Sequence, residues 1–400
     1  MPSLRLPALC AASALVLLAG CRPDTIWAPD GKSLAVTAPG GLYRFDLAKE
    51  KFEPLVRGPQ RAINPAWSAD GKHLCYFLAS TQQGKVGSAS LVALDLQTRK
   101  QTMLVPKLGL PDLKSSQPGS NPALLLKQVF TASWSPNGKQ IAYITHQAGR
   151  SVLAVVPAAG GTPKSLTAPP NEALAPAWSP AGTEIAYLVE ARGKPGPGGI
   201  PASHGPITVH SILPDGKGHR LLWTPPAGLA LNPVPLGPQW AKDGKSLAVI
   251  AEKTPAGTDP AAAPDPTAGT SSEVWTILRT GGGEKLADVP GAAIGCSLSA
   301  DLRSVVFFRP SSEQPPRHLD VAVLTAPFKE AKTLFTIDVP AEPPGAGGPP
   351  GDIDAPPIPT LSPDGSHVAL LTTFDPGIPR LLIAAPGDKE PHSYPLPGGK

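Results

Sequence analysis

The sequence predicts an all-β fold built from seven copies of one four-stranded antiparallel unit. The first observation is a recurring motif of the type W-S-P-D-G-K, which a short apolar segment follows directly. The second is a further pair of apolar segments in each copy, separated by glycines or by Asp-Gly. The third is that the middle segments are apolar without alternation, which is typical of strands covered on both faces. These patterns predict a seven-bladed β-propeller, with six or eight blades as alternatives.

The motif supplies the turn between the first two strands, A and B, of each copy. The copies begin near residues 27, 67, 134, 178, 240, 298 and 361. Five of them open on a tryptophan: Trp27, Trp67, Trp134, Trp178 and Trp240. Six contain a glycine that we expect in the left-handed conformation: Gly31, Gly71, Gly138, Gly182, Gly244 and Gly365. We predict that each tryptophan is a wedge packed between blades, and that the recurrent aspartates serve the turn.

Strand direction sorts the connections into two groups. The A–B and C–D turns lie at one end of the propeller, and the B–C and D–A connections lie at the other. Nearly all the long Pro/Gly-rich segments fall in the second group: residues 80–90, 106–125, 190–206, 252–272, 309–317 and 338–357. Long loops on a rigid scaffold commonly carry binding residues, although residues 255–270 and 340–351 have the composition of neutral insertions.

The N-terminus predicts export. Residues 1–20 read as a signal peptide, with a positive Arg5 and an apolar stretch too short to span a bilayer. The sequence L-A-G-C that ends at Cys21 resembles the lipobox of bacterial lipoproteins. That resemblance implies a lipid on Cys21, a very short tether at residues 21–24, and a location in the cell envelope. Arg22 at the next position favours the outer membrane in a Gram-negative host. An ordinary secretory signal is the alternative.

The repeats of residues 25–400 resemble the PD40 repeats of TolB-like propellers, which also occur in the non-catalytic domains of prolyl-oligopeptidase-type peptidases. Two departures matter. TolB has an additional N-terminal α/β domain, for which we expect no room between Cys21 and Trp27. The peptidases have an α/β-hydrolase domain, and we find no G-x-S-x-G nucleophile elbow. The resemblance is specific for the fold and weak for function.

Composition narrows the function classes. The formal net charge is +4, without a Lys/Arg run that would neutralise a row of phosphates, so we predict no nucleic-acid binding. Cys75 and Cys296 fall in different copies and are expected to be buried free thiols. We predict no cofactor.

Three histidines, His146, His204 and His318, are the weak site candidates on the long-loop face. Some propeller lyases use a histidine-lined, metal-assisted site at the central opening, but these three lie in copies 3, 4 and 6 and in segments expected to be flexible loops. We therefore expect no metal site there. Asp352 and Asp354 could ligate a cation, although a solvated pair is the simpler interpretation.

The sequence thus predicts a lipid-anchored envelope protein, not an enzyme, that binds a protein or peptide partner through one propeller face. The alternatives are a metal-assisted polysaccharide lyase at the channel mouth and a sensor of carbohydrate or another small ligand.

The first prediction concerns Cys21. The Cys21→Ser variant should accumulate as unacylated precursor or soluble protein, because the thioether cannot form. Labelling with a radioactive fatty acid measures this, and acyl label retained by the variant would show that Cys21 is not the attachment site.

Overall fold

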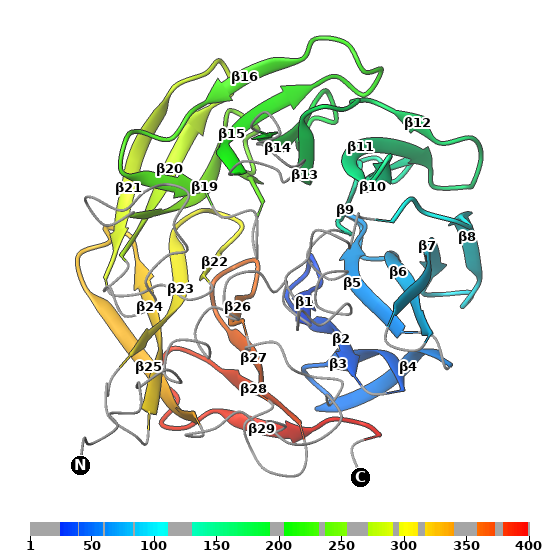
Figure 1. Cartoon of the computed structure of the whole chain (residues 1–400). Helices are drawn as coiled ribbons and strands as arrows, with labels where there is room; N and C mark the ends of the chain where they lie inside the picture. Colours follow the sequence, from blue (N-terminus) through cyan, green and yellow to red (C-terminus); the bar gives the residue numbers. More distant parts are fainter. Residues whose placement is uncertain are drawn as a thin grey trace, which may run out of the picture.

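Each repeated motif forms the A–B turn of one four-stranded sheet in the computed structural model. The structure describes residues 25–38, 40–58, 61–82, 85–110, 130–192, 204–231, 237–253, 271–290, 296–310, 317–339, 358–372 and 379–398. Seven antiparallel sheets stand around a central axis, with the A strands innermost and the D strands at the rim (Figure 1). The predicted seven-bladed propeller is therefore confirmed.

The blades follow the chain in order. Blade 1 contains β1 (Thr25–Trp27), β2 (Ser33–Ala38), β3 (Gly41–Asp46) and β4 (Lys51–Arg57). Blade 2 contains β5 (Arg61–Trp67), β6 (His73–Gln82), β7 (Lys85–Asp95) and β8 (Gln101–Val105). Blade 3 contains β9 (Ala132–Trp134), β10 (Gln140–Gln147), β11 (Arg150–Pro157) and β12 (Lys164–Ser165). Blade 4 contains β13 (Glu172–Trp178), β14 (Ile185–Arg192), β15 (His204–Ile212) and β16 (Arg220–Trp223).

The remaining blades have the same order. Blade 5 contains β17 (Leu229–Leu231), β18 (Gln239–Trp240), β19 (Ser246–Lys253), β20 (Ser272–Leu278) and β21 (Gly283–Val289). Blade 6 contains β22 (Cys296–Leu298), β23 (Ser304–Pro310), β24 (Arg317–Thr325) and β25 (Ala331–Val339). Blade 7 contains β26 (Thr360–Leu361), β27 (Val368–Thr372), β28 (Arg380–Ala384) and β29 (His392–Pro395). No helix in these described ranges is long and apolar enough to cross a membrane.

Blade 5 departs from the simple repeat, because its inner strand is split. Both β17 and β18 pair with β19, and Val249 and Ile250 lie between the two paired segments. The sequence between β17 and β18 contains three prolines, which have no N–H to donate to a sheet. The split leaves the number of blades unchanged.

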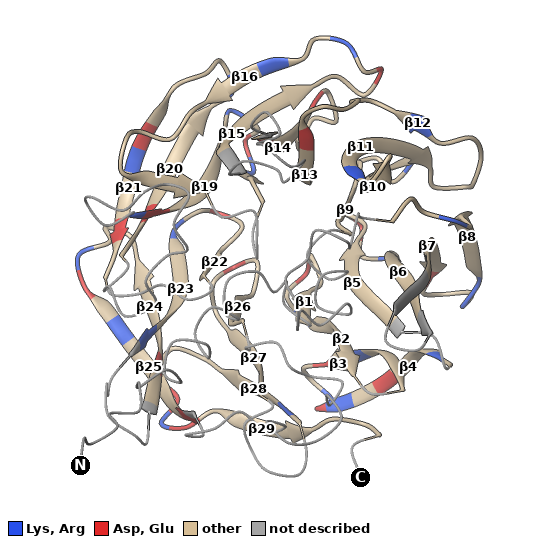
Figure 2. Ribbon diagram, viewed as in Figure 1, with Lys and Arg blue, Asp and Glu red and all other residues tan. Residues whose placement is uncertain are grey.

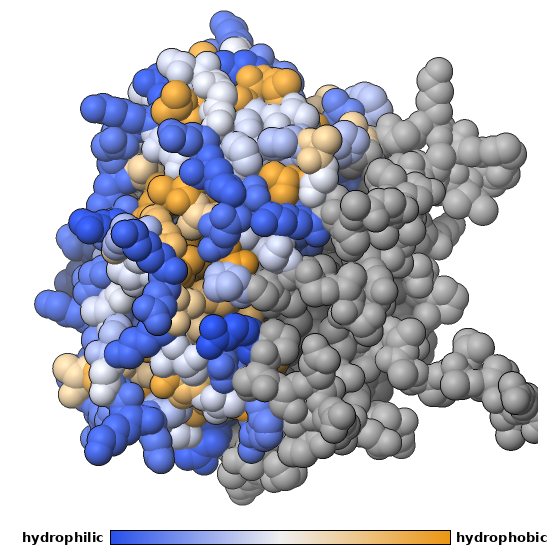
Figure 3. Space-filling model, turned by 90° about the vertical axis from the view of Figure 1, so that its left-hand side faces the viewer, coloured by the Kyte–Doolittle hydropathy of each residue, from blue (hydrophilic) through white to orange (hydrophobic). Residues whose placement is uncertain are grey.

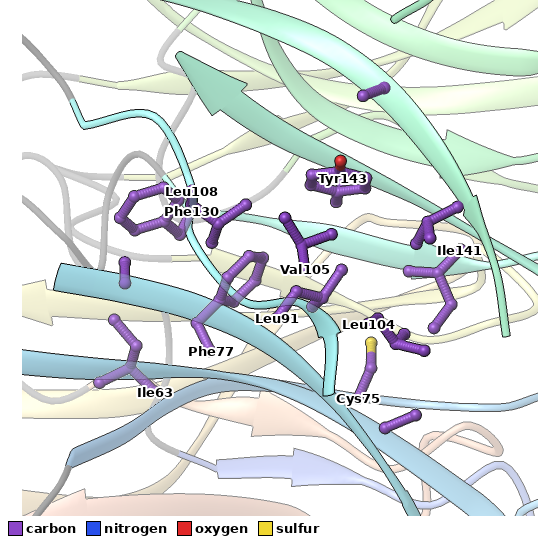
Figure 4. Packing of buried hydrophobic residues seen from close by; sticks show 14 of the residues in the cluster. Ile63, Cys75, Phe77, Leu91, Leu104, Val105, Leu108, Phe130, Ile141 and Tyr143 are labelled. Carbon is purple, nitrogen blue, oxygen red and sulfur yellow. The ribbon is translucent and has the colours of Figure 1, made fainter. Parts of the chain in front are cut away.

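The core consists of one apolar cluster at each interface between neighbouring blades. Successive side chains of a strand point to opposite faces, so a B strand feeds two clusters. Cys75 and Phe77 pack toward blade 3, in the cluster drawn in Figure 4, whereas Leu74 and Tyr76 pack toward blade 1. This is why the middle strands are apolar on both faces.

The five A–B turns that contain the motif serine share one hydrogen-bonding scheme. The serine hydroxyl accepts the N–H five residues on, as from His73 to Ser68 and from Gln140 to Ser135, both at 2.9 Å. The aspartate or asparagine accepts the N–H two residues on, as from Lys72 to Asp70 at 3.0 Å. The six motif glycines have φ between 66° and 71°. In the sixth copy Leu302 occupies that position, with φ of 59°, and its side chain is buried between blades 5 and 6.

The motif tryptophans link the inner strands around the ring. In four of them the indole Nε1 donates a hydrogen bond to a carbonyl in strand A of the preceding blade. These bonds are 3.0–3.1 Å long and join Trp27 to Thr360, Trp67 to Ile26, Trp134 to Ala66 and Trp240 to Ala177. Trp178 packs in the same way, but its Nε1 has no hydrogen-bond partner. Its backbone N–H donates to the Ser133 hydroxyl at 3.2 Å.

The ring closes between blades 7 and 1 through side chains, because all strands of blade 1 come from the start of the described chain and all strands of blade 7 from its end. The Trp27–Thr360 bond, a 3.3 Å contact between the Thr25 and Thr360 hydroxyls, and a shared apolar cluster form this seam. At the rim the Tyr394 hydroxyl donates to Glu50 at 2.9 Å.

The second prediction compares two tryptophans that are equally buried, at 7% exposure each. Replacing either Trp134 or Trp178 with Ala should cost about 3–5 kcal/mol of unfolding free energy, because a large buried side chain is lost. Replacing Trp134 with Phe should cost about 1 kcal/mol more than the same change at Trp178, because only Trp134 loses an indole hydrogen bond. Urea denaturation measures both, and equal losses for the two Phe variants would contradict the role given to the indole–carbonyl bond.

Candidate functional site

The end of the propeller that carries the A–B and C–D turns, here the turn end, uses its polar groups within the fold. The recurrent aspartates accept backbone N–H groups of their own turns. In blade 7 the Ser362 hydroxyl and the Ser366 N–H lower the pKa of Asp364 to about 2. These carboxylates therefore do not form an acidic site, as the turn chemistry of the sequence already indicated.

The opposite end, here the loop end, is where the B–C and D–A connections leave the strands. The prediction of a long loop at residues 80–90 is wrong. Most of this segment belongs to a hairpin in which β6 ends at Gln82 and β7 begins at Lys85. The polar, small residues of this segment suggested a loop, but cross-strand backbone pairing does not require apolar side chains. The other five segments do separate strands at this end, as expected.

Two groups of charged side chains lie near the loop end. Between blades 3 and 4, Glu172 accepts a hydrogen bond from Ser151 at 3.3 Å and lies 3.8 Å from the Arg150 guanidinium. On blade 5, Lys253 is within 3.1 Å of Asp288 and 3.4 Å of Glu273. Across the whole ring, positive and negative side chains are interspersed among the blades (Figure 2), and hydrophobic surface on the visible rim stands in separate patches (Figure 3). These paired charges favour specific polar contacts over a single-sign electrostatic field.

The structure does not bring the three candidate histidines together, and it corrects their placement in flexible loops. His146 lies in β10, is 8% exposed, and packs edge-on against Phe130 with Nδ1 3.3 Å from the Gly109 carbonyl. His318 lies in β24, with Nδ1 2.6 Å from Asp338 of the outer strand β25. His204 begins β15, and its side chain lies outside the described residues.

Strand pairing explains these positions. The B–C hairpins of blades 3 and 4 extend further than the apolar runs that marked them in the sequence, so His146 and His204 pair within them. His318 pairs with Asp338 of β25. Across the described ranges there is no group of three or more His, Cys, Asp or Glu side chains that could hold a metal ion. Cys21, Asp352 and Asp354 fall outside the described residues.

Neither core thiol is positioned as a nucleophile. Cys75 and Cys296 are buried free cysteines in blades 2 and 6, as expected. Burial raises the pKa of Cys75 to about 12. The pKa of Cys296 is also raised, mainly by burial and to a smaller extent by the nearby Glu252 carboxylate. Both remain protonated near neutral pH, and a thiol is a weak nucleophile in that form.

Sequence reasoning missed two polar clusters. Glu184, 4% exposed in its side chain, bridges Arg220 of its own blade and Arg279 of blade 5 at the turn end. His210 and His219 approach within 3.0 Å on blade 4. Burial, with the charge of His219 as a smaller contribution, lowers the pKa of His210 to about 4. No motif marked these residues; only the hairpin register of β15 and β16 could have suggested that the two histidines meet.

Comparison with known proteins supports the fold. No family model matches the sequence, and no curated protein sequence matches it. Among solved structures, the oligogalacturonate lyase from Vibrio parahaemolyticus superposes with a TM-score of 0.62 at 14% identity, covering 92% of this chain and 91% of that one. An oligogalacturonate lyase in complex with manganese gives a TM-score of 0.59, also at 14% identity with 92% and 91% coverage. TolB from Acinetobacter baumannii gives 0.47 at 13% identity, covering 92% of this chain and 79% of that one.

The chain shares its fold with the two lyases. The seven blades and the motif turns confirm the resemblance to TolB-like propellers at the level of the fold. At identities this low the likeness to the lyases also concerns the fold alone, because one fold supports unrelated activities.

The third prediction follows from buried His146. Burial lowers the pKa of His146 to about 4 from 6.5, so the folded state favours the neutral ring. The stability from this group is present above pH 6.5 and is lost as the pH falls toward 4, by about 3 kcal/mol in all.

A His146→Gln variant should therefore lose less stability than the wild type between pH 6.5 and pH 4. Urea melts across this range measure the difference, and His392→Gln, at an exposed position of β29, is the control. Identical pH profiles for the wild type and His146→Gln would contradict the burial of a neutral histidine.

Proposed function

We propose that this protein is a lipid-anchored binding protein of the cell envelope that engages a protein or peptide partner with the loop end of its propeller. The observation that supports this most is the difference between the two ends. At the turn end the recurrent polar side chains are hydrogen-bonded within their own turns. At the loop end the connections differ widely in length from blade to blade, from the short turn at residues 148–149 to the long segments at residues 106–131 and 340–359.

The place of the first strand supports the same end. Strand β1 starts at the loop end with Thr25, which is 1% exposed and contacts Thr360. Three residues lie between Cys21 and Thr25, so the two Cα atoms are four steps, or about 14 Å at most, apart when the chain is fully extended. A lipid on Cys21 would hold the loop end near the bilayer, and partners in or on the same membrane would meet that end first.

A binding role is preferred to a catalytic one because the groups that could carry chemistry are used by the fold. The recurrent aspartates complete turns, the two thiols are buried and protonated, and His146 is packed against Phe130. The lyase and small-ligand alternatives have no comparable observation in their favour among the described residues.

The fourth prediction uses both ends of two strands. A photo-cross-linking amino acid at Gln147 or Lys253 lies at the loop end of β10 or β19, and the same amino acid at Lys139 or Lys245 lies in the turn that directly precedes the same strand. Irradiation of intact cells should give one common protein adduct from Gln147 and Lys253 and none from Lys139 and Lys245.

The paired positions control for expression, folding and anchoring, because the two positions of each pair lie at opposite ends of one strand. Adducts formed only from Lys139 and Lys245 would assign the partner to the turn end. Absence of adducts at all four positions, with normal lipid labelling, would count against a protein partner.

A further inference from the structure

Two histidines meet on blade 4, at the rim and toward the turn end. His210 lies in β15, and His219 lies in the C–D connection just before β16. The Nδ1 atom of His210 is 3.0 Å from Nε2 of His219, and the two ring planes differ by 12°. The buried Tyr187 ring lies beside both, with centroids 6.0 Å and 6.1 Å away. His219 is exposed, so the pair is accessible from solvent.

A third residue fixes which nitrogen of His210 is free to act as a ligand. The Thr208 hydroxyl donates to the Val189 carbonyl at 3.4 Å, and its oxygen is 2.9 Å from His210 Nε2. When the Thr208 hydroxyl donates to Val189, its oxygen accepts the Nε2 proton of His210, and this is the tautomer that the proposed site uses. The neutral ring then has its lone pair on Nδ1, which is the atom directed at His219.

We propose that His210 and His219 form a two-histidine site for a divalent transition metal of the copper(II) or nickel(II) type. Metal–nitrogen bonds of about 2.0–2.1 Å to two atoms 3.0 Å apart would meet at an angle of about 95°, once both rings turn so that their lone pairs point at the ion. That angle suits the adjacent positions of a tetragonal site, which copper(II) and nickel(II) prefer, better than the wider angle of tetrahedral zinc.

Binding replaces the hydrogen bond between the two rings. His219 moves its ring proton from Nε2 to Nδ1, so both ligands stay neutral and no proton is released. Water molecules complete the coordination. The Thr208–His210 hydrogen bond holds the ligand ring in place, as the second partner of a metal-bound histidine usually does.

Calorimetry and electron paramagnetic resonance on the full chain in detergent test the proposal. One copper(II) ion per chain should bind, with a spectrum that shows two imidazole nitrogens, and zinc(II) should bind more weakly. His219→Gln should weaken copper(II) binding at least tenfold, whereas His392→Gln, also exposed but on blade 7, should leave it unchanged. Unchanged affinity in His219→Gln, or tighter zinc(II) than copper(II) binding, would overturn the proposal.

A second variant tests the positioning role of Thr208. Thr208→Val keeps the shape of the side chain and removes the acceptor for His210 Nε2, so copper(II) affinity should fall by about tenfold. The melting temperature of each variant without metal separates this effect from a loss of folding. Neither experiment depends on the partner proposed for the loop end, so failure of one proposal leaves the other standing.

Discussion

The ring depends on a large apolar side chain at the end of each strand A that packs against the preceding blade, and at four of the seven junctions an indole–carbonyl hydrogen bond reinforces this packing. Strand A is an edge strand, and an edge presents unpaired N–H and C=O groups. The tryptophan of the next blade fills the wedge between two sheets and satisfies one of these carbonyls, as Trp67 does for Ile26. Packing and hydrogen bonding therefore fix the same residue at the same position in successive blades.

Blades 6 and 7 have no tryptophan at this position, and other side chains there make the link between the inner strands. In blade 6 Leu298 takes its place, and the Gln239 amide of blade 5 donates to the carbonyls of Leu298 and Ser299. In blade 7 Leu361 takes its place, and its N–H donates to the Ser297 hydroxyl at 3.4 Å. A neighbouring polar side chain thus links the inner strands where no indole is present. Leucine preserves the apolar wedge, which is why both copies still form blades.

The fold was largely predictable because local and long-range signals agree. The turn from Ser135 to Lys139 specifies a hairpin by its own chemistry, and the unbroken apolar run from Leu153 to Val156 requires cover on both faces. Strand ends were less predictable. Backbone pairing carries β6 and β7 through small polar residues, and strand A of blade 5 is split into β17 and β18. Neither feature has an apolar pattern that reports it.

The candidate site was less predictable for a related reason. The residues that repeat are the ones that build the blades, so the strongest pattern in the sequence describes the scaffold. Residues that could serve function occur once each. His146 and His318 looked alike in sequence, yet one is packed against Phe130 and the other pairs with Asp338 at the rim. Only the register of β15 and its turn brings His210 to His219.

The two proposed sites lie at different ends of the molecule, and this has a consequence for how they act. The partner would bind at the loop end, close to a lipid on Cys21, whereas His219 belongs to a C–D connection and so to the turn end. Metal binding changes the affinity for a partner only if the metal-free and metal-bound forms of the histidine pair give the loop end different conformations. The pair is set in a rigid sheet over buried Tyr187, and β14 and β15 run unbroken between the two ends except for one irregularity near Arg192. A packed sheet that has no alternative conformation carries little conformational change from one end to the other. We therefore expect occupancy of the metal site to leave partner binding unaltered.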